Sequence, residues 1–105
     1  MGRLKKDAMQ SAVEALSSAI IAARLNDTVV ISDLRKTTEA QDITAPRAWL
    51  FVEYDVPDGI TAITKVELLG NNNVAMTTAA VNVRVMPPMV MRHILYAQEG
   101  GEQNG

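Results

Sequence analysis

The sequence predicts an α+β protein, in which an N-terminal amphipathic helix precedes a small antiparallel β-sandwich or twisted β-meander of about five or six strands. Two observations predict this class. Apolar residues recur every three or four positions near the N-terminus, and from Thr28 onward they recur at every second position. Turn residues separate the later runs, as in the Pro-Asp-Gly at 57–59 and the asparagines at 71–73. We therefore expect the 105 residues to form a single domain, with the helix at 1–27, the β-domain at 28–98 and a polar tail at 99–105.

The expected helix carries one apolar stripe, at spacings of four, three and four residues: Met9, Val13, Leu16 and Ile20. Alanines between these positions favour the helix, and Asn26 and Asp27 are expected to end it. One interpretation packs the stripe on the protein's own sheet. The other gives the helix a second apolar edge, Ile21 and Leu25, that neighbouring subunits share.

Alternation with a period of two predicts the strands that follow. Val29 and Ile31 begin the first strand, and the polar run at 35–46 is expected to be a loop or an edge strand. The run at 47–54 is the clearest strand, and large apolar groups on both of its sides predict a central position. One side carries Ala48, Leu50, Val52 and Tyr54, and the other carries Trp49, Phe51 and Glu53.

A β-hairpin and a final strand complete the predicted sheet. Val66 and Leu68 are expected to point inward from the first hairpin strand, and a bulge is expected near 77–79 on the second. The inward positions of that second strand are Ala79, Val81, Val83 and Val85. The strand at 89–98 presents two sides, one with Val90, Ile94 and Tyr96 and the other with Met89, Met91, His93 and Leu95.

No residue pattern predicts catalysis, a cofactor or a metal site. The chain has no cysteine, and its one histidine, His93, lies in an apolar strand without nearby acidic partners. Asp55 and Asp58 flank a turn, where acids serve as turn residues more often than as general acids or bases. Phosphate-binding loops and nucleophile elbows are absent from the sequence. We therefore expect a protein that is not an enzyme.

Charge and hydropathy limit the partners. A formal net charge of -2 argues against a nucleic-acid-binding face, which needs clustered basic residues. The N-terminal segment contains Asp7, Gln10 and Glu14 where a signal peptide needs an apolar core, so we expect a soluble protein with no cleaved leader and no membrane partner. Large apolar side chains remain as candidate interface residues: Ile21, Leu25, Trp49, Phe51, Met86 and Met89. For the aromatic pair, packing in the core is the alternative.

The region from Ile63 to Val85 carries a recognisable pattern. Its first strand contributes Ile63, Lys65, Val66, Glu67, Leu68 and Leu69, and the turn and second strand contribute Asn73, Val74, Val81, Val83 and Val85. With the final strand added, the pattern covers about the last 40 residues. It resembles small virion proteins of tailed bacteriophages, and their tail-collar or tail-fibre attachment domains.

The resemblance implies a non-catalytic structural component of a phage particle or phage-derived device, associated with the tail, fibre or baseplate. Such a protein would be made in the bacterial cytoplasm, would reside in the virion, and would act by docking to other virion proteins and by forming homo-oligomers. The alternative function is a small ligand-binding or regulatory module, with a pocket between helix and sheet lined by Trp49 and Tyr54.

Overall fold

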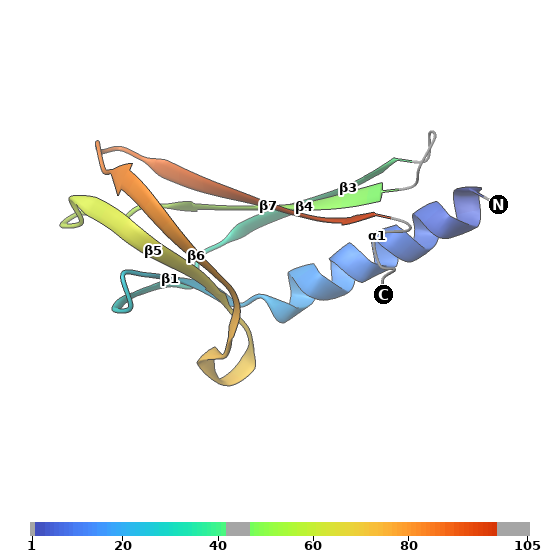
Figure 1. The fold of residues 1–105 in the computed structure, drawn as a ribbon, viewed down its shortest axis with the longest axis horizontal. Coiled ribbons are helices and arrows are strands. Elements are labelled where there is room, and N and C mark those ends of the chain that lie inside the picture. Colours follow the sequence, from blue (N-terminus) through green and yellow to red (C-terminus); the bar gives the residue numbers. More distant parts are fainter. Residues whose placement is uncertain (1, 42–46, 99–105) are drawn as a thin grey trace. The chain divides into compact units, whose positions relative to one another are not determined.

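The computed structural model describes residues 2–41 and 47–98, with side chains at 8–40 and 47–96. Over these residues one α-helix precedes seven strands in two antiparallel sheets, which confirms the α+β class and adds to the expected strand number (Figure 1). The elements in chain order are α1 (Gly2–Ala19), β1 (Ala22–Leu25), β2 (Val29–Ile31), β3 (Arg35–Gln41), β4 (Arg47–Asp55), β5 (Ala62–Leu69), the short 3-10 turn η1 (Asn71–Asn73), β6 (Ala75–Arg84) and β7 (Val90–Gln98). The sandwich packing of the sheets stays a prediction, and the expected tail at 99–105 lies outside the described residues.

Helix α1 is shorter than predicted. It ends at Ala19 rather than at Asn26, and β1 follows in the segment that was expected to be its last two turns. The reason lies in Asn26 and Asp27, which both adopt positive φ, at 54° and 67°. An asparagine in this left-handed region can end a helix, but two such residues in succession also form the tight turn of a hairpin. Here they connect β1 to β2.

The first sheet has the strand order β2-β1-β5-β6. Strand β1 is antiparallel to both of its neighbours, so that Leu25 lies opposite Val29 on one side and opposite Val66 on the other. Val66 and Leu68 are buried as expected, but Ile63, Glu67 and Leu69 are buried as well. The second half of β5 is therefore covered on both faces, a condition that simple alternation does not reveal.

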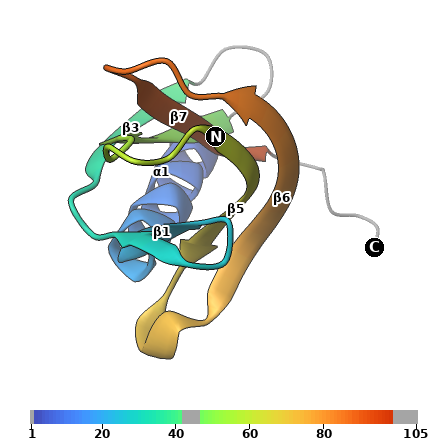
Figure 2. The same ribbon diagram turned by 90° about the vertical axis from the view of Figure 1, so that its left-hand side faces the viewer.

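Strands β5 and β6 form a long, curved hairpin that is joined by η1 (Figure 2). The turn is confirmed: Asn72 and Asn73 have positive φ, at 61° and 59°. The predicted bulge adjoins residues 77–79 rather than lying within them: residues 77–80 of β6 pair regularly with β5, and Met76, just before Thr77, falls in a register shift. Register shifts lie on either side of this stretch, between the partners of Ile63 and Lys65 and between those of Leu68 and Leu69.

On β6 the inward positions hold in the second half only. Val85 is buried and Val81 and Val83 are half-buried, whereas Ala79 is exposed, contrary to expectation. The register shift lies between Ala80 and Val83, the partners of Lys65 and Ile63, so the exposed Ala79 and the buried Val85 are on opposite sides of it.

The second sheet has the order β3-β4-β7, which confirms β4 as its central strand and the polar run beginning at Arg35 as an edge strand. Four side chains of β4 are fully buried, at alternating positions: Ala48, Leu50, Val52 and Tyr54. This is the side predicted from the sequence. The backbone N–H of Val56 donates to the carbonyl of Met89 at 2.9 Å, just beyond the adjoining ends of β4 and β7.

The chain divides into two compact units. One contains most of α1 with residues 36–41, 47–52 and 93–98 of the second sheet, and the other contains the whole first sheet with residues 53–55 and 90–92. In the helix-containing unit, Val13 of the predicted stripe is 2% exposed, and Met9 and Leu16 are partly covered. The stripe is thus the packed side of the helix.

Candidate functional site

The residues predicted to form an interface differ widely in exposure. Met86 is 70% exposed and Ile21 is 44% exposed, whereas Trp49, Phe51 and Met89 are partly covered. Leu25 is fully buried in β1 and is no longer a surface candidate. The helix edge that Ile21 and Leu25 were expected to share does not exist, because both residues lie beyond the end of α1.

Strand β7 contributes large apolar side chains that the interface prediction missed. Val90, Ile94 and Tyr96 are 51%, 56% and 64% exposed, while the alternate positions at 91, 93 and 95 are partly covered. The sequence did separate these two sides of the strand. Arg92, which shares the side of Val90, Ile94 and Tyr96, is the signal that marks this side as the one facing water.

Side-chain alternation in β4 and β7 places these residues on the same side of the sheet as the aromatic residues of β4. Arg92 Nε lies 3.3 Å from Glu53 Oε2, so the two residues are cross-strand neighbours on one face. In an antiparallel ladder, each further step of two residues along both strands keeps the same face. Ile94 and Tyr96 therefore lie on the same side of the sheet as Phe51 and Trp49. We call these four residues the aromatic face.

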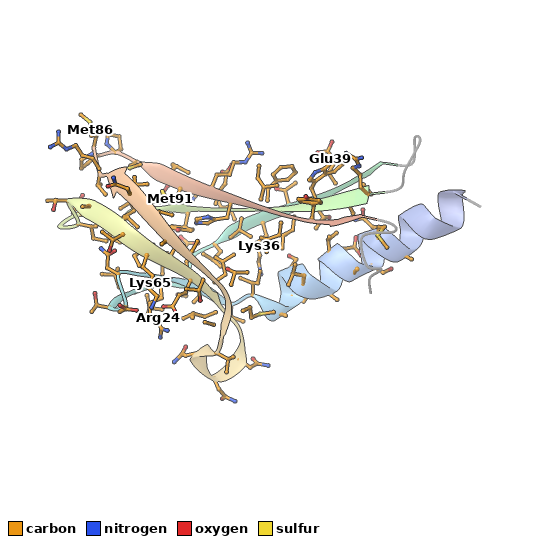
Figure 3. The ribbon with its side chains drawn as sticks, viewed as in Figure 1. Arg24, Lys36, Glu39, Lys65, Met86 and Met91 are labelled. Carbon is orange, nitrogen blue, oxygen red and sulfur yellow. The ribbon has the colours of Figure 1, made fainter. Side chains whose placement is uncertain are left out.

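Helix α1 covers the opposite side of the same sheet. The Lys36 Nζ donates to the carbonyl oxygen of Ser17 at 2.6 Å, and Gln10 Nε2 donates to Thr38 Oγ1 at 3.2 Å. Side chains alternate along β3, so Thr37 and Glu39 belong to the side away from the helix. Figure 3 shows Lys36 on the helix side of β3 and Glu39 on the other. Among the residues that the structure describes, the aromatic face is thus the side of this part of the sheet away from α1.

An exposed group of ion pairs lies at the other ends of the same strands. Arg35 contacts Glu53 at 4.0 Å and Asp55 at 3.1 Å, and Arg92 contacts Glu53 at 3.3 Å. All four side chains are at least 37% exposed, so water screens these pairs and they contribute little to stability. Both signs of charge are present in equal number, which gives this group no preference for an anionic or a cationic partner.

The polar contacts of the first sheet have a structural explanation. Arg24 and Glu67 are direct cross-strand partners, with Arg24 Nε 2.7 Å from Glu67 Oε1, and Glu67 is only 5% exposed. The hydrogen bond from Arg24 lowers the pKa of Glu67, so this carboxylate stays ionised and is poorly suited to donate a proton. Lys65 Nζ contacts Asp27 Oδ1 at 2.7 Å and likewise lowers the pKa of that carboxyl group.

The residues considered for catalysis are not arranged as a site. Asp55 pairs with Arg35, and Asp58 lies in the turn before Gly59, whose φ of 96° requires glycine. His93 is partly covered within β7, and burial lowers its pKa. Among the residues with described side chains, no group of three or more His, Cys, Asp or Glu gathers to hold a metal ion.

The expected ligand pocket is not formed by the two residues proposed for it. Tyr54 is fully buried on one side of β4, and Trp49 lies on the other side of the strand, partly exposed. Residues an odd number of positions apart point to opposite faces of a strand and cannot line one cavity. This correction leaves the aromatic face as the candidate functional site.

Of the helical residues that the structure describes, none belongs to a stretch apolar and long enough to cross a membrane. Comparisons of the chain with protein-family models, with curated proteins and with solved structures find no match.

Proposed function

We propose that this chain is a non-catalytic structural protein that docks to other proteins through its aromatic face. The observation that carries the proposal is the sheet side away from α1, on which Ile94 and Tyr96 are more than half exposed and Trp49 and Phe51 are partly exposed. Monomeric proteins rarely leave several large apolar side chains together in water, and such patches commonly mark interaction sites. Aromatic residues also contribute strongly to binding energy at interfaces.

The β5–β6 hairpin resembles small virion proteins of tailed bacteriophages, and this resemblance supports a phage particle as the place where the docking occurs. It favours a component of a phage particle or phage-derived device that is associated with the tail, fibre or baseplate and resides in the virion. A structural role also agrees with polar groups that pair with one another: Glu67 is held by Arg24, and Asp55 is held by Arg35. In this function, the partners are other virion proteins and further copies of the chain.

Replacing exposed members of the aromatic face tests the proposal. Ile94→Ser and Tyr96→Ser remove apolar contact area from side chains that are more than half exposed, so the fold should persist. Val74→Ser is the matched control, because Val74 is 61% exposed and lies between η1 and β6. We expect at least about a tenfold loss of both β7 variants from purified particles, which is about 1.4 kcal/mol of docking energy, with the control unaffected.

The readout is the amount of the chain in purified particles, with circular dichroism of each isolated variant as the check on folding. Incorporation of both β7 variants at the wild-type level would overturn the docking role of the aromatic face. Absence of the wild-type chain from the particles would overturn its assignment to the virion.

A further inference from the structure

We infer that β7 is a self-association edge, along which two copies of the chain pair as antiparallel strands. This inference rests on the proposed docking function, because Ile94 and Tyr96 belong to the aromatic face. It adds the identity of one partner, a second copy, and the strand through which that copy binds.

The four sheet edges in the described part of the chain differ in how they resist strand pairing. Strand β2 has only three residues, and β6 contains two register shifts. Strand β3 carries Arg35, Lys36 and Glu39 among polar residues. Short length, bulges and charged side chains are the devices by which proteins keep sheet edges from pairing with other chains.

Strand β7 has fewer of these devices: Arg92 is its one Asp, Glu, Lys or Arg residue, and it pairs with Glu53 of the neighbouring strand. It lies at the edge of its sheet, it is nine residues long, and its sequence VMRHILYAQ contains neither proline, glycine nor lysine. Three of its side chains are large, apolar and more than half exposed: Val90, Ile94 and Tyr96. An edge of this kind is open to an additional strand. The contrast with the polar edge strand β3 in the same sheet indicates that pairing is directed to β7.

The order of residues along β7 favours a second copy in a particular register. With Ile94 on the two-fold axis, the two Ile94 side chains meet, and Arg92 of each copy lies opposite Tyr96 of the other. An isoleucine pair and an arginine over an aromatic ring are both favourable cross-strand contacts. A two-fold axis at Arg92 would place two arginines opposite each other, which is unfavourable at any pH. An axis at His93 would place two histidines opposite each other, which is unfavourable at low pH, where both are charged.

Such a dimer is closed. Each β7 edge is used once, so the strands β3-β4-β7 of the two copies become one continuous sheet that ends in the polar β3 at both sides. The aromatic faces of the two copies become neighbours on that sheet, which enlarges the surface available for docking to a third protein.

The absence of cysteine from the sequence allows a direct test by disulfide formation. In the proposed register, opposite Cα atoms at position 94 lie about 4.5–5.5 Å apart, within the range that a disulfide bridges. In the same register, residue 90 of one copy lies opposite residue 98 of the other. The two residues at position 90 are then eight residues apart along the strand, or about 27 Å at about 3.3 Å per residue. Ile94→Cys should therefore form a covalent dimer on mild oxidation, whereas Val90→Cys, at similar exposure on the same strand, should not.

A charge exchange gives an independent measurement. Ile94→Lys and Ile94→Glu should each sediment as monomers, because like charges would meet at the axis, and their equimolar mixture should sediment as a dimer. A monomeric Ile94→Cys protein after oxidation, equal cross-linking of Val90→Cys, or a mixture that stays monomeric would overturn the inference.

The two proposals fail in different experiments. Loss of Tyr96→Ser from particles without any cross-linking of Ile94→Cys would overturn strand pairing alone. Cross-linking of Ile94→Cys with normal incorporation of both Ile94→Ser and Tyr96→Ser would support strand pairing and overturn the docking function.

Discussion

Replacement of Asn26 should destabilise the protein more than its position in a surface turn suggests. The Asn26 Nδ2 donates to the carbonyl of Ala62 at 2.8 Å, and its Oδ1 accepts from the backbone N–H and the hydroxyl group of Thr64 at 2.8 and 3.2 Å. The Asn26 backbone N–H also donates to the carbonyl of Lys65 at 3.0 Å. One side chain thus ties the β1–β2 turn to the beginning of β5.

The expected magnitude follows from these contacts and from the φ of 54°. Three solvent-accessible side-chain hydrogen bonds contribute about 2 kcal/mol together, at the lower end of the usual net value for each. An alanine in the left-handed region costs about 1 kcal/mol more, whereas glycine does not incur that cost. We expect Asn26→Ala to lower the free energy of unfolding by about 3 kcal/mol, and Asn26→Gly by about 2 kcal/mol.

Urea unfolding followed by the fluorescence of Trp49, the one tryptophan of the chain, measures both variants. Asn71→Ala is the matched control, since Asn71 is exposed and has no positive φ, and it should stay within about 0.5 kcal/mol of wild type. If Asn26→Ala also stays within that limit, the tie to β5 contributes nothing. Equal losses for alanine and glycine would refute the backbone part of the reasoning.

Substitutions at three further positions have expected outcomes. Asn72→Val should lower the unfolding free energy by about 1–2 kcal/mol, because a β-branched residue is strained at a φ of 61°, while Asn72→Gly should be tolerated in the same urea titration. Gly70→Ala places a Cβ 2.8 Å from Met76 Sδ, but Met76 is 41% exposed and its side chain can move aside. Thermal unfolding should therefore show a loss of stability below about 1 kcal/mol, and a loss near about 3 kcal/mol would mean that the Met76 side chain is fixed. The lowered pKa of Glu67 means that stability from its bond with Arg24 is present above the ordinary glutamate pKa and is lost as the pH falls through the folded-state pKa. Glu67→Gln should therefore flatten the acid side of the stability profile, and an unchanged profile would contradict the lowered pKa.

The sequence predicts best where a strand has one covered side. Strand β4 is the clearest case, because its buried residues at 48, 50, 52 and 54 follow the alternation without exception. The turn at 71–73 is equally clear, since asparagine is among the few residues that tolerate positive φ. Both features depend on local chemistry that neighbouring residues display directly.

The prediction fails where one sequence pattern fits both a helix and a buried strand. Ala22, Ala23 and Leu25 continue the alanine-rich composition of α1, yet they are buried in a strand between two others. Alanine has high helix propensity, but its small side chain also fits between closely packed layers, and burial outweighs a propensity difference of a few tenths of a kcal/mol. The pairing with β5, which lies about 40 residues away, and the hairpin with β2 together select the strand.

The β7 residues of the aromatic face, Ile94 and Tyr96, escaped prediction for a related reason. Alternation in β7 separates two sides that are both apolar, so hydropathy alone does not say which side is covered. The charge of Arg92 decides it, because the ion pair with Glu53 forms on the side away from the buried residues of β4 and leaves Ile94 and Tyr96 on that same side. A single charged residue within an apolar strand thus identifies the side that a monomer leaves in water. Where that strand is also an unprotected sheet edge, the same residues become the expected contact with another protein.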